Sequence, residues 1–373
     1  MLATFFKKID WWIVLTVFPL LSLSLTTLNG FSLSGSSLML RQLVMIVVSL
    51  IFFFFLAFVN FSFIKQSRII FYIYIFSVAL LVALVFVGST TKGATSWFDF
   101  GAFSFQPSDL IKLTLVLLLA KYLARRHIEI RSMKHIFITG LYFIIPFGLI
   151  VLQPDFGSAL IVFCIWFGMI LVSGISKKHL GLLFATGFLV FVLMWSFGFK
   201  DYQKDRIRTF LDPLSDIQGA GYNAYQSVIA VGSGELTGKG VGYGTQSRLS
   251  FLPEHETDFI FAAISEEWGF VGSSLMILLF LILIVRILLI GYHTHSIFEL
   301  LFAVGLAMYY MSHVIVNIGM NIGVMPVTGV PLPFVSYGGT HILIEFIGLG
   351  MLMSFRNNAR SLYKDNSPDV FLR

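Results

Sequence analysis

The stretch IIFYIYIFSVALLVALVFVG, residues 69–88, decides the fold class, because it runs for 20 residues without one charged side chain. A helix of about 20 apolar residues spans the hydrocarbon core of a bilayer. The whole chain shares this character: 57% of its 373 residues are hydrophobic and only 12% are charged. Ordinary soluble domains carry about 25% charged residues. The composition therefore excludes a soluble enzyme, a nucleic-acid-binding module and a disordered scaffold.

Further apolar stretches predict an all-α integral membrane protein, a polytopic bundle of about ten transmembrane helices. We expect one domain over residues 1–373, with a large external loop at about 200–268 and a re-entrant loop before the last span. The stretch after Lys7 and Lys8 lacks a small-x-small cleavage site, so we interpret it as a retained span. The predicted spans are 11–28, 42–63, 69–88, 107–123, 135–152, 156–173, 179–199, 269–292, 297–319 and 338–355.

The distribution of Lys and Arg predicts the orientation. An even number of spans puts both termini on one side, together with one set of connecting loops. That side holds 16 of the 25 basic residues, the opposite side holds eight, and Lys112 lies inside a span. Because cytoplasmic loops are enriched in Lys and Arg, we expect both termini in the cytoplasm and the 200–268 loop outside.

Two groups of polar residues lie at the outer ends of predicted spans, where buried polar groups are costly and therefore candidates for function. Asp109 and Lys112 are three residues apart and share a helix face. They form either a buried ion pair or a carboxylate and a cation that face an external cavity. Asp155, in the string QPDFGS, either caps a helix or is held beside Lys112.

The large loop carries ten acidic and six basic residues, which argues against a surface for polyanions. We expect it to contain short helices at the membrane face. Arg206 lies near its start, and its Gly-Lys pair at 238–239 lacks the spacing of a phosphate-binding loop. Asp258 precedes the apolar string FIFAAI, so burial and neighbouring charges would tune it as a general base. The alternative is a helix N-cap.

Residues 317–340 are apolar yet interrupted by three prolines and many glycines. Non-helical backbone at membrane depth is tolerated where it lines a cavity or is buried in protein. We expect a re-entrant loop whose N–H groups near Ser336 and Gly338 meet an anionic head group; a tight connector is the alternative. His341 and Glu345, four residues apart, are expected to form a self-satisfying buried pair.

Metal and thiol chemistry find little support in the sequence. Cys164 is the single cysteine, so a disulfide within the chain and a cysteine metal site are both excluded. The spacing of His and Cys residues matches no zinc site. A loosely held divalent cation, bridging carboxylates and a pyrophosphate, stays open.

With these residues in view, the chain resembles the SEDS family of cell-wall polymerases over about residues 10–360. Its string VTGVPLPFVSYGG is similar to the RodA elongation branch rather than to the FtsW division branch. FtsW and SpoVE are relatives of RodA within the family. The matching strings are QPSDLIK, QPDFGSA, RIRTFLDP, GYNAYQS, GSGELTGKGVGYGTQS, FLPEHETDFIFAAISEEWGFVG and NIGMNIGVMPVTGVPLPFVSYGG.

The resemblance implies an inverting peptidoglycan glycosyltransferase that polymerises lipid II on the outer face of the cytoplasmic (inner) membrane. It implies Asp258 as the catalytic carboxylate, and it places Lys112 and Asp155 in the substrate site. The remaining substrate-binding candidates are Asp109, Arg206, Ser336 and Gly338. Implied partners are a class B penicillin-binding protein, which crosslinks the strands, and other membrane proteins of the elongation complex.

The chain departs from the family pattern at three places. Asp109 stands where the family usually has Glu, and Ser96, before Trp97, stands where it usually has Arg. Thr340 and His341 replace a usual pair of serines. Two other functions remain open, a lipid II flippase and a non-catalytic scaffold of the wall-synthesis complex. A flippase needs polar residues in both halves of the membrane, whereas the ionisable residues at depth cluster in the outer half.

Overall fold

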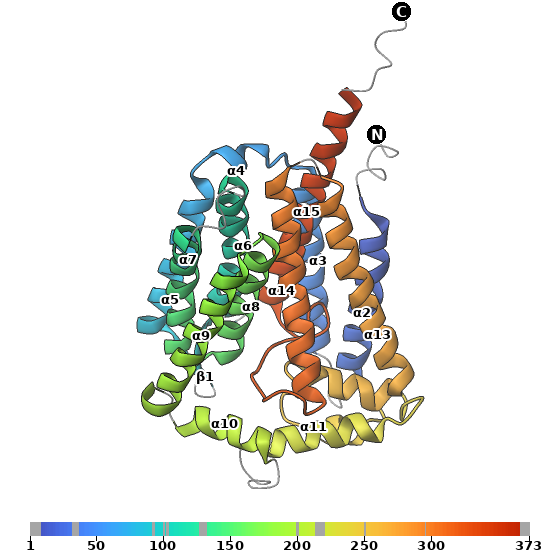
Figure 1. The fold of residues 1–373 in the computed structure, drawn as a ribbon. Coiled ribbons are helices and arrows are strands. Elements are labelled where there is room, and N and C mark those ends of the chain that lie inside the picture. Colours follow the sequence, from blue (N-terminus) through green and yellow to red (C-terminus); the bar gives the residue numbers. More distant parts are fainter. Residues whose placement is uncertain are drawn as a thin grey trace, which may run out of the picture.

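The computed structural model describes residues 9–31, 37–91, 94–99, 101, 104–126, 133–198, 201–212, 221–249, 251–294 and 296–365. Lys7 and Lys8, which enter the prediction of the first span, lie outside the described residues. Most of the described chain is helical, and long helices run side by side as a bundle (Figure 1). The protein is thus a multi-pass, all-α membrane protein, as predicted.

Each predicted span coincides with a long helix of the described chain. These helices are α2 (Trp11–Phe31), α3 (Ser37–Phe58), α5 (Ile69–Val87), α6 (Pro107–Arg126), α7 (Met133–Leu152), α8 (Phe156–Val172), α9 (Lys177–Leu193), α13 (Ile260–Tyr292), α14 (Ile297–Asn321) and α15 (Gly339–Asp365). Seven helices, or apolar stretches within them, are long and apolar enough to cross a membrane among the described residues. The other three fall short for physical reasons, because α8 is only 17 residues long and α6 and α15 carry charged residues, among them Lys112 and Glu345.

Several helix boundaries differ from the prediction. The second span was predicted at 42–63, but α3 begins at Ser37, because a helix end tolerates the exposed Arg41, whose charge reaches the polar interface. Helix α13 begins nine residues before its predicted span, and its backbone breaks at Gly269, which has a φ of 67°.

The large loop contains the short helices that were predicted. They are α10 (Asp201–Leu211), α11 (Tyr222–Ser233) and α12 (Thr245–Arg248), and a π-helical turn (Met194–Gly198) precedes them. Helices α10 and α11 run across one end of the bundle, and the two termini lie at the opposite end (Figure 1). One more short helix, α4 (Ser62–Gln66), connects α3 to α5 near the termini.

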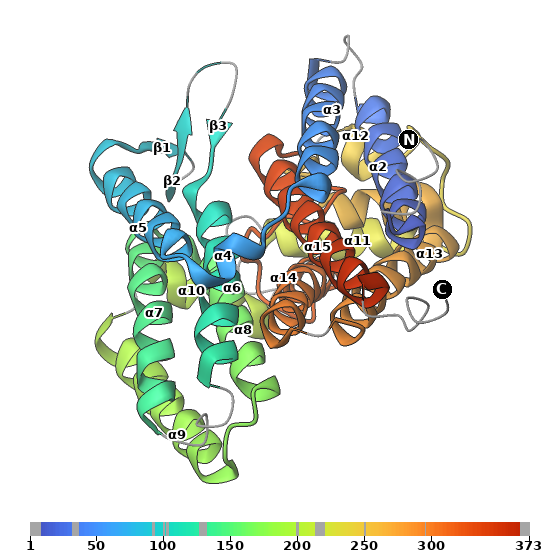
Figure 2. The ribbon, with the colours of Figure 1, turned by 90° about the horizontal axis from the view of Figure 1, so that it is seen from above.

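A small antiparallel sheet, which the sequence did not predict, lies beside α5 and α6 (Figure 2). Its strands are β1 (Ser89–Thr91), β2 (Ala94–Asp99) and β3 (Ser104–Phe105), in that order. Ser96 is buried on β2. The Thr340 hydroxyl donates to the Ser104 carbonyl at 2.6 Å, which ties the sheet to the start of α15.

Helix α14 lies between two groups of helices. It packs against α6 and α8 on one side and against α13 and α15 on the other (Figure 2). The core is formed around these helices, and α15 also packs along α3. Helix α9, by contrast, has no buried residue, and most of its apolar side chains are exposed.

Ion pairs join the helices at the end that holds the termini. Asp10, which precedes α2 and is 1% exposed, receives two hydrogen bonds from the Arg286 guanidinium, at 3.0 and 2.7 Å. The Arg356 guanidinium approaches the same carboxylate to 3.2 Å. The buried Glu299 on α14 pairs with Lys65 on α4. Buried charges therefore occur at both ends of the bundle, whereas the sequence predicted that ionisable residues at depth cluster in one half.

Candidate active site

A break in α13 organises the end of the bundle that holds the short helices. At Gly269 the helix loses its regular hydrogen bonds, and a turn of the large loop supplies partners instead. The Phe270 N–H donates to the Glu235 carbonyl at 2.9 Å, and the Val271 N–H donates to the Leu236 carbonyl at 3.1 Å. Only glycine adopts this backbone conformation readily, so the break follows from the residue type.

Glu266, one turn before this break, fixes the Gly-rich part of the loop. Its side chain is fully buried, and one oxygen accepts hydrogen bonds from the Lys239 ammonium and the Thr245 N–H, each at 2.8 Å. The Gln246 N–H also donates to it, at 3.1 Å. A carboxylate is favoured at a helix N-terminus, where N–H groups point outward. The Gly-Lys pair therefore serves the structure of the loop.

Asp258 lies at the start of α13, where its backbone is held by two asparagines. The Asp258 carbonyl oxygen accepts from the Asn317 amide at 2.9 Å and from the Asn321 amide at 3.0 Å. The N-cap position of α13 is Phe259, so the alternative that Asp258 caps this helix is wrong. The side chain is half-buried, and Oδ2 faces Gly329, where an added methyl group would lie 3.3 Å away.

Asn317 and Asn321 are functional candidates that the sequence reasoning missed. They lie one turn apart on α14, and both are fully buried. The Asn317 amide also donates to the Val330 carbonyl at 2.7 Å, and the Asn321 side-chain oxygen accepts from the Ala262 N–H at 3.1 Å. Their signal in the sequence was the pair of amides four residues apart at the end of the predicted span 297–319.

The segment predicted as a re-entrant loop is non-helical, and its second half is largely buried. Residues 330–338, which we call the PLP loop, form the second half of the connection between α14 and α15, and Val330, Leu332 and Phe334 belong to the hydrophobic core. The Ser336 hydroxyl accepts from the Leu332 N–H at 2.8 Å and donates to the Thr257 carbonyl at 2.6 Å. The residue before Asp258 is thus bonded directly to this loop.

The N–H groups of the PLP loop are used within the protein. Ser336 N–H donates to the Leu332 carbonyl at 3.0 Å, and Gly338 N–H donates to the Gln42 side-chain oxygen at 3.3 Å. The prediction that these two N–H groups are open to an anion is therefore wrong, because the loop turns back on itself and on α3. Gln42 also donates to the Ser336 carbonyl at 3.1 Å.

A second group of charges lies behind the PLP loop, and we call it the buried polar cluster. The Lys112 ammonium lies 3.0 Å from Asp109 Oδ1, and the two residues are 1% and 0% exposed. His341 Nδ1 lies 3.3 Å from the same oxygen, and its Nε2 lies 3.0 Å from Glu345 Oε1. The structure therefore shows the buried ion pair, which was one of the two alternatives. Asp109 and Lys112 do not face an external cavity, because the side chains of α14 and α15 cover them.

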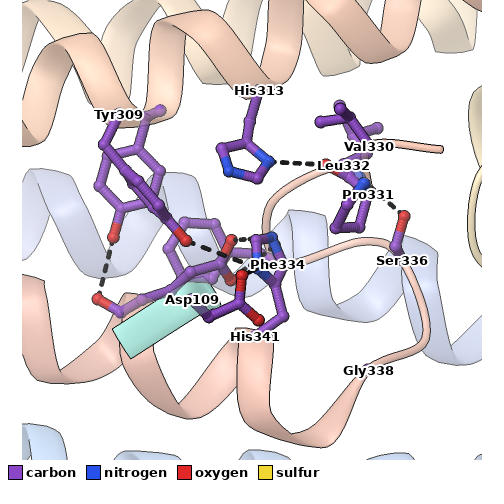
Figure 3. Close-up of polar contacts among 12 residues, drawn as sticks. Asp109, Tyr309, His313, Val330, Pro331, Leu332, Phe334, Ser336, Gly338 and His341 are labelled. Carbon is purple, nitrogen blue, oxygen red and sulfur yellow. Dashed lines mark hydrogen bonds and ion pairs between the residues drawn. The ribbon is translucent and has the colours of Figure 1, made fainter. Parts of the chain in front are cut away.

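Figure 3 shows how this cluster meets the PLP loop. Glu345 accepts a hydrogen bond from the Phe334 N–H at 3.0 Å. Phe334 has a backbone φ of 60°, which residues other than glycine rarely adopt. His313 on α14 is bonded to the Pro331 carbonyl at 3.1 Å and lies over the His341 ring (Figure 3). His341 and Glu345 are buried side by side as predicted, but the pair is not self-satisfying, because His341 also contacts Asp109 and Glu345 also holds the loop in a strained conformation.

The remaining candidates lie apart from these contacts. Asp155 caps α8, because its side chain accepts from the Ser158 N–H at 2.9 Å, and its other oxygen accepts from Gln106 at 3.4 Å. The side-chain contacts of Asp155 are thus to Ser158 and Gln106, and not to Lys112. Arg206 is exposed on α10. Among the residues that the structure describes, no group of three His, Cys, Asp or Glu side chains is placed to hold a metal ion.

Comparisons with known proteins give a consistent result. The family model FTSW_RODA_SPOVE, described as "Cell cycle protein", matches residues 3–361. The chain is 40% identical over 293 residues to the peptidoglycan glycosyltransferase MrdB of Escherichia coli K12, which covers 79% of each chain.

Solved structures agree with this match. One belongs to a structure described as "Structural coordination of polymerization and crosslinking by a peptidoglycan synthase complex", with a TM-score of 0.81, 31% identity, and coverage of 94% of this chain and 98% of that one. Another is the rod shape determining protein RodA of Thermus thermophilus, with a TM-score of 0.70, 28% identity, and coverage of 94% and 97%.

Proposed function

The chain belongs to the FtsW/RodA/SpoVE family, and from this premise we propose that it is a peptidoglycan glycosyltransferase that polymerises lipid II during cell elongation. Its similarity to MrdB and to a chain of a peptidoglycan synthase complex supports the activity. Its similarity to RodA supports the role in rod shape. A division role of the FtsW type is the second candidate within the family.

The placement of Asp258 is the observation that carries the proposed mechanism. Its backbone is fixed by Asn317 and Asn321, so the carboxylate projects from a rigid support while its side chain stays half-buried. General-base catalysis requires a group held in position within reach of the proton that it removes. A half-buried carboxylate on a fixed backbone meets that requirement.

The reaction that we propose is a single displacement. Asp258 takes the proton from a sugar hydroxyl of lipid II, and the hydroxyl oxygen bonds to the anomeric carbon of the growing strand. The bond from that carbon to the lipid diphosphate breaks, and the diphosphate leaves with the bonding electrons. One displacement inverts the anomeric configuration, and the diphosphate leaves without the acid that glycosidases need for an alkoxide.

We assign Lys112 to the leaving diphosphate, with Asp109 holding the ammonium in place. Because the ammonium is buried beneath α14 and α15, its contact with a diphosphate requires α6 and α15 to separate. Asp155, Arg206, Ser336 and Gly338 stay as proposed substrate-site residues. Ser336 and Gly338 would act by shaping the PLP loop, since their N–H groups are already bonded.

Partners and location follow from the same premise. We propose a crosslinking class B penicillin-binding protein as the partner, because the similar synthase complex combines polymerisation with crosslinking. We place the chain in the cytoplasmic membrane, with its termini inside and with α10, α11 and Asp258 at the outer face. The excess of Lys and Arg on the side of the termini supports this orientation.

The experiment that tests this function is reconstitution of the purified chain in lipid vesicles with labelled lipid II, with and without the partner transpeptidase. Glycan polymer is measured by gel electrophoresis, and translocation is measured by protection of the label. We expect polymer. Translocation without polymer, with and without the transpeptidase, would show that the protein is a flippase. The absence of both polymer and translocation would favour a non-catalytic scaffold.

A further inference from the structure

Two basic side chains from different helices converge on one buried oxygen atom. Lys112 on α6 and His341 on α15 both approach Oδ1 of Asp109, the ammonium to 3.0 Å and the ring Nδ1 to 3.3 Å. None of these three residues is more than 2% exposed. The other oxygen of Asp109, Oδ2, is buried and has no hydrogen-bond partner among the described residues. Oδ1 therefore occupies a position at which donors from α6 and α15 meet a single anionic oxygen.

The contacts of the His341 ring indicate that it is an imidazolium. Its Nδ1 faces Asp109, and its Nε2 lies 3.0 Å from Oε1 of Glu345. Ionised carboxylates only accept hydrogen bonds, and an imidazole ring donates from both nitrogens only when it is positively charged. The Tyr309 hydroxyl, 3.5 Å from Nδ1, is a longer contact than the one to Asp109. The positive charge also balances the cluster, because Lys112 and His341 then face two carboxylates.

The other histidine of the buried polar cluster, His313, is neutral by the same reasoning. Its Nδ1 is bonded to the Pro331 carbonyl, which only accepts, so this nitrogen carries the proton. Its Nε2 is buried without a hydrogen-bond partner in the described chain, which would be costly for a charged ring. The ring centroids of His313 and His341 lie 4.8 Å apart, where two positive charges would repel each other. His341 is therefore the charged histidine.

Glu345 determines the direction in which the imidazolium donates. Its carboxylate holds Nε2 and accepts from the Phe334 N–H at 3.0 Å, so the ring is anchored to the PLP loop. The partner of one ring nitrogen sets how the other nitrogen is presented. The Nδ1–H group of His341 is consequently directed at Asp109 on α6 (Figure 3).

We propose that His341 is a second cation for the lipid diphosphate, which binds between His341 and Lys112 in place of Oδ1 of Asp109. This inference rests on the proposed function, in which Lys112 meets the leaving diphosphate, and it requires the same separation of α6 from α15. The short Asp109 side chain moves away with α6, whereas the flexible four-carbon stem of Lys112 lets its ammonium reach the gap. Charge-assisted hydrogen bonds from two cations offset the charge of a diphosphate better than those from one.

The test measures binding, so it is separate from turnover. The full chain in lipid nanodiscs is titrated by calorimetry with farnesyl diphosphate, a short lipid diphosphate, and with farnesol, which has the same chain without the diphosphate. His341→Gln should weaken farnesyl diphosphate binding at least about tenfold, the effect of one charge-assisted hydrogen bond. Farnesol binding should not change. His135→Gln, which replaces a buried histidine on α7, is the matched control and should change neither affinity.

Two outcomes for His341→Gln would overturn the proposal. The first is a farnesyl diphosphate affinity equal to that of the parental chain. The second is an equal loss of affinity for farnesyl diphosphate and farnesol, because His341 would then be purely structural. If His341→Gln misfolds, as judged by its melting temperature, the double variant with Glu345→Gln replaces it and should show the same selective loss. The second change removes the carboxylate that the first leaves without its cation.

The parental chain separates this site from the proposed activity. Farnesyl diphosphate binding no tighter than farnesol binding would overturn the diphosphate site, Lys112 included. Lipid II polymerisation is scored in parallel. Tight diphosphate binding that depends on His341, in a chain that makes no polymer, would support this site while contradicting the proposed glycosyltransferase.

Discussion

The Ser336 hydroxyl donates a hydrogen bond of 2.6 Å to the carbonyl oxygen of Thr257, the residue before Asp258. These residues are 79 positions apart in the chain. The same hydroxyl accepts from the Leu332 N–H, so it closes the PLP loop and attaches it to the start of α13 in one contact. The loop thereby sets the position of the proposed general base.

Ser336→Ala should therefore impair both stability and turnover. The Leu332 N–H and the Thr257 carbonyl lose their partner, and an unsatisfied buried polar group costs about 1–3 kcal/mol. We expect a lower melting temperature and a loss of polymerisation larger than the loss of folded protein. Ser312→Ala is the control, because that hydroxyl bonds only to carbonyls of its own helix. If both variants polymerise lipid II equally well, the PLP loop does not position Asp258.

A double-mutant cycle on Lys112 and Asp109 separates a structural role of Lys112 from a functional one. Lys112→Met alone should destabilise the protein by about 3–5 kcal/mol, since it leaves a buried carboxylate with less compensation. Adding Asp109→Asn removes that charge, so the melting temperature should recover. Polymerisation should stay low in the double variant, because the cation for the diphosphate is gone. A double variant that recovers both stability and turnover would make Lys112 purely structural.

Gly269→Ala tests the break in α13. A methyl group there would lie 2.3 Å from the Gly238 nitrogen and 2.6 Å from the Leu236 carbonyl oxygen, and the backbone conformation itself suits only glycine. We expect a loss of at least about 2 kcal/mol, measured by thermal unfolding in detergent. Gly232→Ala is the matched control, since nothing lies within 4 Å of its added methyl group. Equal melting temperatures for the two variants would contradict this account of the break.

Asp10 predicts a specific dependence of stability on pH. Burial alone would raise the pKa of this carboxyl, but Arg286 and Arg356 outweigh burial and hold the pKa below its usual value. A lowered folded-state pKa stabilises the fold above the unfolded pKa of about 3.9, and this contribution is lost as the pH falls through the folded value.

The parental chain should thus lose melting temperature more steeply than Asp10→Asn as the pH is lowered from about 5 to 3. At neutral pH the variant should be the less stable of the two. Glu235→Gln, at an exposed position, should follow the parental curve. Parallel curves for the parental chain and Asp10→Asn would show that the Asp10 ion pairs do not stabilise the fold.

The sequence predicted the spans because apolar length is a local property of the chain. It also offered the Asp155 cap of α8 as one of two alternatives, and there a short-range hydrogen bond decides the structure. It could not predict that His341 lies between Asp109 and Glu345, because α6 and α15 meet only through tertiary packing. The small sheet was missed for a similar reason, since its strands are two to six residues long.

The candidate site was predicted in part. Asp258 was identified from its place between a polar loop and an apolar helix, yet the two asparagines that hold it come from α14, more than 50 residues away. For Lys112 the sequence left a buried ion pair and a cation facing a cavity open as alternatives, and the structure shows the buried pair. A helix face can be read from a three-residue spacing, but which helices cover that face depends on the whole bundle.

The most direct measurement of the central claim is the rate of lipid II polymerisation by Asp258→Asn in lipid vesicles. Asn317 and Asn321 bind the backbone of residue 258, so the substitution should leave the fold and the melting temperature unchanged. Positioned general-base catalysis contributes about 10²–10⁴-fold, so the rate should fall by at least about 100-fold. Glu256→Gln, two residues earlier and also half-buried, should keep the parental rate. A rate for Asp258→Asn above about a tenth of the parental value would contradict the account, because the loss of a general base lowers the rate by more than about tenfold.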